Sequence, residues 1–318
     1  MRSMYKFLLI VIASVIGFLL IFNLMTPIIS KVMPDQFEKA DLVLDSLKSK
    51  KFQPEIVAFG SSLVQTGIDG YVLRKELKTE KIYNLAVPGY DLKAICGYLP
   101  YLPSTVETVI LGVRIDDFAT TKIIKNKNNK VQDSLFQTYI SKKANDAEQF
   151  FLSKNFKNRG SLLAGIQISV TAILDNDAPG EESLNIIYPY LYPNNRAVST
   201  YQRDIERRNN EVKDHFTDNK FNTEFLELLK RTNEYLKFKN INLVVYLSPS
   251  SPDIEFTSQE KTKNFITEIE NKLPKDIDLV NCFYTLKADE FYDSVHPNRI
   301  GAEKISKKIA QHILNDRK

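Results

Sequence analysis

The strongest constraint on the fold is an alternation of short apolar runs with longer amphipathic segments. Five runs rich in β-branched residues predict buried strands at residues 55–59, 81–85, 108–113, 240–247 and 277–283. Apolar residues at helical spacing predict helices at residues 31–50, 69–78, 91–102, 220–238, 258–273 and 299–314. Strands that alternate with helices favour an α/β fold, here a three-layer sandwich around a central parallel sheet.

The composition excludes several classes of protein. Hydrophobic residues make up 43% of the 318 residues and charged residues 26%, which is close to the average for globular proteins and unlike a disordered chain. The chain carries 43 basic and 39 acidic residues, a net charge of +4. Because nucleic-acid binders usually carry a concentrated basic surface, we expect no nucleic-acid partner.

Residues 7–25 form an uncharged, apolar stretch near the amino terminus. As a helix this stretch spans about 28 Å, close to the thickness of the hydrocarbon layer of a membrane. We therefore expect residues 1–30 to form one transmembrane anchor, with a cleaved signal peptide or a buried core helix as the alternatives. Arg2 and Lys6 precede the span, which predicts a short cytoplasmic end at the cell membrane and an extracellular or periplasmic domain over residues 31–318.

One segment of the predicted domain, residues 119–215, does not follow the alternation of strands and helices. We interpret it as a long insertion between the third and fourth strands. Insertions on a rigid sheet commonly carry substrate-binding surfaces.

Three short segments carry residues suited to chemistry, and each follows a predicted strand. Ser61 and Ser62 follow the first strand, Gly89 follows the second, and Asp293 and His296 precede the last helix. Because ligands bind at the carboxyl ends of parallel strands, these segments are expected to meet at one edge of the sheet.

Each segment also has a purely structural interpretation. Either serine can cap the following helix, Gly89 can be an ordinary turn residue, and Asp293 and His296 can be a turn and a surface residue. Taken together, however, a serine, an imidazole and a carboxylate favour a nucleophile, a general base and the group that orients the base.

The three segments resemble the SGNH (GDSL-type) hydrolase superfamily, over residues 55–118 and 240–312. The resemblance implies that Ser62 is the nucleophile, since G-S-S stands here where the family has G-D-S. The D-x-x-H-P segment likewise implies that Asp293 is the acid and His296 the base.

The same resemblance implies an oxyanion hole formed by Ser62, Gly89 and Arg114. The family's third conserved block is G-x-N-D, and Arg114 stands here at the position of its asparagine. An arginine can stabilise an oxyanion or bind an anionic substrate, and it can equally pair with Asp116 or Asp117 as a structural bridge.

An anchored, outward-facing domain of this family resembles the proteins that acylate cell-surface polymers, of the teichoic acid D-alanylation and alginate acetylation types. The resemblance implies transfer of an acyl group, expected to be acetyl, onto an extracytoplasmic polysaccharide or a teichoic-acid-like wall polymer. It also implies a multi-span membrane-bound O-acyltransferase as partner. An esterase of the same polymers and a non-catalytic glycan-binding scaffold are the alternatives.

The remaining candidate residues give simpler expectations. Cys96 and Cys282 are expected to be separate, small hydrophobic residues, although an oxidising compartment would permit pairing. His215 and His312 lie in polar helical contexts and are expected to be solvated. With so few histidines and cysteines, all scattered, we expect no metal site and no cofactor.

Overall fold

The computed structural model describes residues 5–6, 10–14, 16–17, 36–120, 194, 198–212 and 220–316. The chain divides into two compact units, residues 1–39 with 142–178 and residues 40–141 with 179–318. The α/β body belongs to the second unit, except for the first turn of helix α2 (Gln36–Lys48), whose residues 36–39 are assigned to the first unit.

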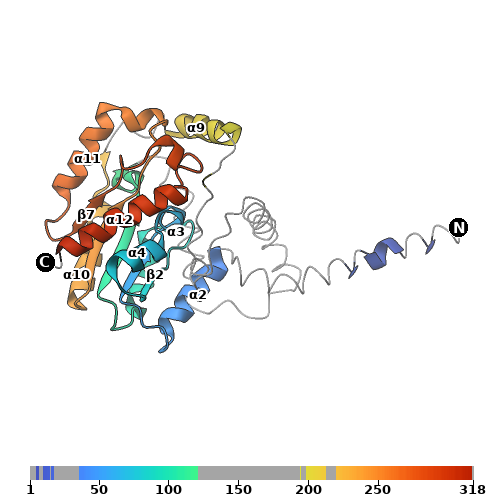
Figure 1. Cartoon of the computed structure of the whole chain (residues 1–318), viewed down its shortest axis with the longest axis horizontal. Helices are drawn as coiled ribbons and strands as arrows, with labels where there is room; N and C mark the ends of the chain where they lie inside the picture. The colour runs from blue at the N-terminus through green and yellow to red at the C-terminus, as the bar shows by residue number, and fades with distance from the viewer. Residues whose placement is uncertain are drawn as a thin grey trace. The chain divides into compact units, whose positions relative to one another are not determined.

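A five-stranded parallel sheet forms the centre of this body, in the order β2-β1-β3-β6-β7 (Figure 1). The strands are β1 (Ile56–Phe59), β2 (Ile82–Asn84), β3 (Thr108–Val113), β6 (Asn242–Leu247) and β7 (Asp278–Asn281). The chain reverses its direction of winding between β1 and β3. In sheets of this kind that switch point is where ligands bind, outside the carboxyl ends of the strands.

Three helices cover one face of the sheet: α3 (Ser62–Gly67), α4 (Gly70–Leu77) and α12 (Arg299–Asp316). They pack on the side chains of Ala58, Ile110 and Val244, which lie in register across β1, β3 and β6 and are at most 1% exposed. Each fully buried valine or isoleucine side chain contributes about 1.5–3 kcal/mol to folding.

Four helices cover the opposite face: α2 (Gln36–Lys48), α5 (Leu92–Cys96), α10 (Thr223–Phe238) and α11 (Glu260–Lys272). They pack on Phe59, Leu111 and Val245, from the same three strands. Because residues on both faces of each central strand are buried, the strands read as continuous apolar runs in the sequence. The α/β class with a central parallel sheet between helical layers is therefore confirmed.

Two predicted helices differ from the structure. Residues 91–102 form α5 and a separate 3₁₀ turn, η1 (Leu99–Tyr101), because Gly97 ends the helix and Pro100 lies at the start of the turn. Residues 220–238 begin with strand β5 (Lys220–Phe221), and Asn222 then caps α10 by accepting a hydrogen bond from the backbone N–H of Phe225.

Strand β5, which follows the predicted insertion, pairs antiparallel with β4 (Ala119–Thr120), which begins it. The later part of the insertion includes helix α9 (Val198–Val212), whereas residues 121–193, 195–197 and 213–215 lie outside the described residues. The described α/β body also contains the 3₁₀ turns η2 (Ile115–Phe118), η6 (Glu255–Ser258) and η7 (Ala288–Glu290).

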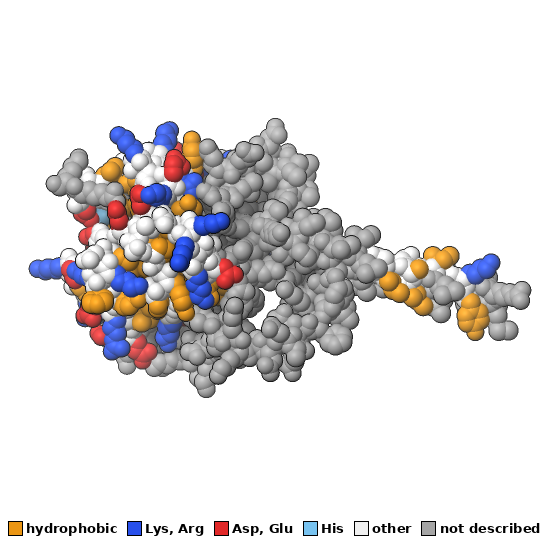
Figure 2. All heavy atoms as spheres, turned by 90° about the horizontal axis from the view of Figure 1, so that it is seen from below, with side chains coloured by type: hydrophobic (Ala, Val, Ile, Leu, Met, Phe, Trp, Pro, Cys, Tyr) orange, Lys and Arg blue, Asp and Glu red, His pale blue; other side chains and the backbone are white. Residues whose placement is uncertain are grey.

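The predicted membrane anchor, residues 7–25, lies largely outside the described residues. Among the residues that the structure does describe, no helix combines the length and apolar character needed to cross a membrane. Acidic, basic and apolar side chains are interspersed on the described part of the face in Figure 2.

Candidate active site

Ser62 is the first residue of α3, three positions after the end of β1. Ser61 caps the helix, because its Oγ accepts a hydrogen bond of 3.4 Å from the backbone N–H of Leu63. The two neighbouring serines therefore have different roles, and the hydroxyl of Ser62 is available for another partner.

Val64 fixes how closely α3 approaches the sheet. A Cβ atom added at Gly112 would lie 1.9 Å from Cγ2 of Val64, and one added at Gly60 would lie 2.2 Å from the same atom. The two glycines thus make room for Val64, which is 1% exposed. This close packing holds the start of α3, and with it Ser62, at the carboxyl edge of β1 and β3.

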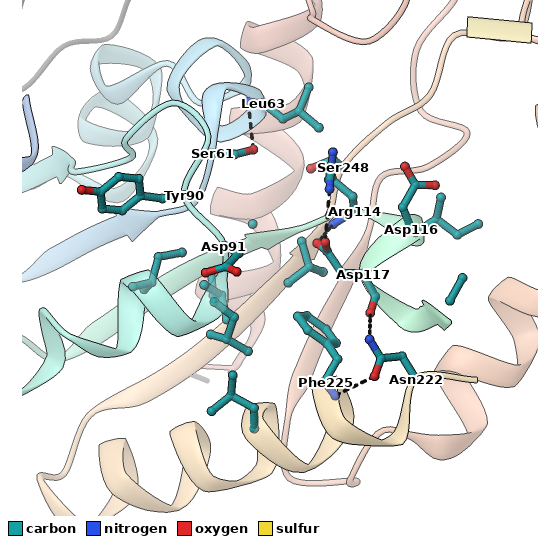
Figure 3. Close-up of a pocket in the computed structure, with 18 of the residues that line it drawn as sticks. Ser61, Leu63, Tyr90, Asp91, Arg114, Asp116, Asp117, Asn222, Phe225 and Ser248 are labelled. Carbon is teal, nitrogen blue, oxygen red and sulfur yellow. Dashed lines mark hydrogen bonds and ion pairs between the residues drawn. The ribbon is translucent and has the colours of Figure 1, made fainter. Parts of the chain in front are cut away.

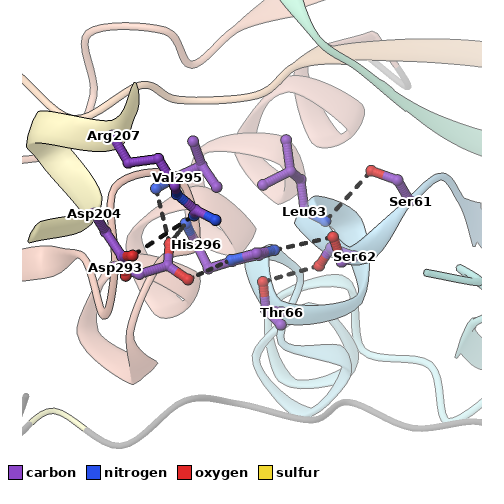
Figure 4. A network of polar contacts seen from close by, with 9 residues as sticks. All are labelled: Ser61, Ser62, Leu63, Thr66, Asp204, Arg207, Asp293, Val295 and His296. Carbon is purple, nitrogen blue, oxygen red and sulfur yellow. Dashed lines mark hydrogen bonds and ion pairs between the residues drawn. The ribbon is translucent and has the colours of Figure 1, made fainter. Parts of the chain in front are cut away.

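His296 and Asp293 lie in the loop between η7 and α12. Oδ1 of Asp293 accepts hydrogen bonds from the backbone N–H groups of Val295 (2.9 Å) and His296 (2.8 Å). Oδ2 lies 2.7 Å from Nδ1 of His296. Both carboxylate oxygens are therefore used to hold the imidazole in place (Figure 4).

The other ring nitrogen of His296, Nε2, lies 2.9 Å from Oγ of Ser62. An ionised carboxylate only accepts hydrogen bonds, so Nδ1 carries the proton of the neutral imidazole and Nε2 accepts from the serine hydroxyl. Burial tends to raise the pKa of Asp293, but its hydrogen bonds with His296 and Val295 outweigh burial and lower that pKa below 3.8. Asp293 is therefore ionised at neutral pH.

A second set of hydrogen bonds braces the loop that carries His296. The backbone N–H of Tyr292 donates to the carbonyl of His296 (2.9 Å), and Phe291 and Pro297 form an isolated antiparallel bridge. Asn298 is fully buried, and its side chain donates to the carbonyl of Asp289 (2.8 Å) and accepts from the N–H of Gly301 (3.1 Å). These contacts tie the loop to the start of α12.

A cleft of about 930 Å³ opens at this edge of the sheet. Ser62 and His296 line it, whereas Asp293 lies behind the imidazole and is not part of the lining. Tyr90 and Asp91, which follow β2, and Asn222 and Phe225, at the start of α10, form other parts of the lining (Figure 3). A cleft of this size can enclose a substrate of several hundred cubic ångströms.

The two other residues of the predicted oxyanion hole, Gly89 and Arg114, line the same cleft. Gly89 follows β2 and has φ of +77°, a conformation that favours glycine. The backbone N–H of Arg114 donates to Oδ2 of Asp117 (2.8 Å), and its guanidinium lies 3.5 Å from Oδ1 of the same carboxylate. The charge of Asp117 raises the pKa of Arg114, so the guanidinium stays ionised.

The cleft wall contains a further ion pair that no sequence pattern predicts. Arg208 of α9 donates a hydrogen bond of 2.7 Å to Oδ2 of Asp116, and only 8% of the Asp116 side chain is exposed. The pair attaches α9 to the turn that follows β3. Its partners are far apart in the chain and match no local pattern, so spacing alone could not have revealed it.

A buried amide was also missed, although the sequence held a signal for it. Nδ2 of Asn84 donates to the carbonyl groups of Val64 (2.9 Å) and Ile68 (3.2 Å), and its Oδ1 accepts from the N–H of Ala86 (3.1 Å). Asn84 thereby joins α3 to the loop that carries Gly89. A polar residue at the end of a buried strand is the signal for such a role.

The two cysteines are free thiols. Cys282 is buried on the face of the sheet that α12 covers, and Cys96 packs against the core of the opposite face. Burial raises the pKa of both thiols, that of Cys282 to about 11. Both residues thus behave as small hydrophobic side chains.

No known family model and no curated protein sequence matches the chain. Among solved structures, the chain is similar to the crystal structure of a candidate acylhydrolase from Bacteroides fragilis NCTC 9343. The two share 11% sequence identity with a TM-score of 0.41, over 88% of this chain and 95% of the other. A likeness this distant says nothing about the reaction or the substrate of the present chain.

Proposed function

We propose that this protein transfers acyl groups through a covalent intermediate on Ser62. The observation that carries the proposal is the hydrogen-bonded series from Ser62 Oγ to His296 Nε2 (2.9 Å) and from His296 Nδ1 to Asp293 Oδ2 (2.7 Å). A nucleophile, a base and an orienting carboxylate at such distances are what acyl transfer by a serine enzyme requires.

In the first step Ser62 Oγ attacks the carbonyl carbon of an acyl ester, and Nε2 of His296 takes the hydroxyl proton. Asp293 stabilises the resulting imidazolium. The backbone N–H groups of Ser62 and Gly89, together with the guanidinium of Arg114, stabilise the negative charge on the carbonyl oxygen. The ester bond then breaks, and the leaving alcohol receives the proton from His296.

In the second step the acyl group leaves Ser62 for an acceptor hydroxyl. Nε2 of His296 removes the acceptor's proton as its oxygen attacks the acyl-serine ester, and the proton returns to Oγ of Ser62. A sugar hydroxyl as acceptor makes the protein a transferase, and water makes it an esterase. The two reactions differ in how far the bound acceptor excludes water from the cleft.

We propose that the acceptor is an extracytoplasmic polysaccharide or a teichoic-acid-like wall polymer and that the acyl group is acetyl. The size of the cleft and the presence of Tyr90 and Phe225 in its lining support a bulky acceptor. The uncharged stretch at residues 7–25 supports a position at the outer face of the membrane. There, a multi-span membrane-bound O-acyltransferase would supply the acyl group.

The test uses the purified full-length protein with p-nitrophenyl acetate as acyl donor and polysaccharides as acceptors. Ser62-dependent release of p-nitrophenol with acetyl groups on the polysaccharide, detected by mass spectrometry, is the expected result. Release of free acetate alone would identify an esterase. A folded protein that gives neither product, and behaves as Ser62→Ala does, would be a non-catalytic scaffold.

A further inference from the structure

Three side chains with metal-binding atoms converge at the end of the sheet opposite the cleft. Asp278 is the first residue of β7, and His312 and Asp316 lie in the last two turns of α12. One ligand atom from each of the three lies within 4.8 Å of the others. Nε2 of His312 is 3.6 Å from Oδ2 of Asp316, too far for a hydrogen bond.

The basic group beside the two carboxylates is the imidazole of His312, and the side chains of Asp278 and Asp316 also hydrogen-bond each other. Within the described part of the chain, no lysine or arginine forms an ion pair with Asp278 or Asp316. Nε2 of His312 is closed to solvent and has no hydrogen-bond partner, although the ring as a whole is partly exposed. The expectation that His312 is simply solvated is therefore wrong at this atom. The imidazole nitrogen of His312 and the two carboxylates therefore face one another within the cluster.

We propose that Asp278, His312 and Asp316 form a binding site for a divalent cation of the zinc type. Zinc binds nitrogen at about 2.0–2.1 Å and carboxylate oxygen at about 2.0–2.2 Å, usually in a tetrahedron. Two ligands of one tetrahedral ion therefore lie about 3.4 Å apart, and the separation between His312 and Asp316 is 3.6 Å. Water would complete the coordination on the exposed side.

The donor set favours zinc over magnesium or calcium, because these harder ions prefer oxygen ligands throughout. A neighbouring amide supports the arrangement, since the side chain of Asn242, at the start of β6, hydrogen-bonds Asp278. Contacts of this kind orient a carboxylate ligand. No local sequence pattern indicates the site, because Asp278 is remote in the chain from the other two ligands.

An ion bound here would join the edge strand β7 to the end of α12. The catalytic loop lies at the other end of α12, so the site stabilises the fold and takes no part in the proposed acyl transfer. Binding to the folded state alone raises the unfolding temperature. At a zinc concentration roughly a hundred times the dissociation constant, the expected rise in Tm is about 5–10 °C.

The test titrates metal-free full-length protein, prepared without a polyhistidine tag, with ZnCl₂ in a calorimeter and with CoCl₂ in a spectrophotometer. We expect one saturable zinc site per chain and the visible absorption of four-coordinate cobalt. Asp278→Asn and His312→Gln should each weaken zinc binding at least tenfold. Glu303→Gln, which removes a carboxylate from the same helix where it pairs with Lys307, is the control and should leave binding unchanged.

The proposal is overturned if folded wild-type protein shows no saturable zinc binding. It is also overturned if either Asp278→Asn or His312→Gln binds zinc as tightly as wild type while circular dichroism shows it to be folded. Magnesium at millimolar concentration should not displace the cobalt spectrum, and displacement would contradict the assignment to a zinc-type ion.

Discussion

The hydroxyl of Ser62 and the imidazole of His296 lie 2.9 Å apart although 234 positions separate them in the chain. The fold explains this distance, because Ser62 begins α3 at the carboxyl end of the interior strand β1, and His296 directly precedes α12, which packs against α3.

Asp293→Asn should reduce kcat for p-nitrophenyl acetate by about 10⁴-fold, because an amide no longer favours the imidazole tautomer that activates Ser62. The matched control is Asp289→Asn, since Asp289 contacts this loop through its backbone carbonyl. That control should keep activity within about twofold. Equal losses in the two variants would indicate a general effect on the loop and contradict the assigned role of Asp293.

The stability contributed by Asp293 should depend on pH. Its pKa in the folded protein is lowered below 3.8, so its contribution is present above that pH and is lost as the pH falls through the folded-state value. The difference in unfolding free energy between wild type and Asp293→Asn should therefore shrink from about pH 6 to about pH 3. Urea unfolding at a series of pH values measures it, and a constant difference would contradict the lowered pKa.

Gly112→Ala should destabilise the protein by about 1–3 kcal/mol, because the new Cβ would overlap Cγ2 of Val64. Val64→Ala removes that atom and leaves a small cavity. The double variant should lose less unfolding free energy than the sum of the losses in the two single variants. The difference, measured by urea unfolding, should be at least about 0.5 kcal/mol. Strict additivity would mean that Val64 does not set the approach of α3.

Arg114→Gln should lower kcat about 10²-fold with a smaller change in KM, if its guanidinium stabilises the oxyanion. Arg203→Gln is the control, since Arg203 is an exposed residue of α9 outside the cleft lining. An unchanged kcat for Arg114→Gln would leave Arg114 with only its structural contact to Asp117.

The sequence predicted the strands well because each central strand is buried on both faces and is therefore apolar throughout. It predicted that the segments with Ser62, Gly89 and His296 meet at one edge of the sheet, because each follows a strand or precedes the last helix, where the topology brings them together. The sequence could not reveal the ion pair between Asp116 and Arg208, because the two residues are 92 positions apart and their contact depends on how α9 packs. The start of α10 was also misplaced, since β5 forms only by pairing with β4.

The most direct test of the central claim is to react the folded full-length protein with a fluorophosphonate and to locate the adduct by peptide mass spectrometry. Phosphonylation of Ser62, with labelling abolished in Ser62→Ala and retained in Ser61→Ala, is the predicted result. Ser61 caps α3, so its loss should cost about 1 kcal/mol of stability and little reactivity. An adduct on Ser61, or no labelling of the folded protein, would contradict the account.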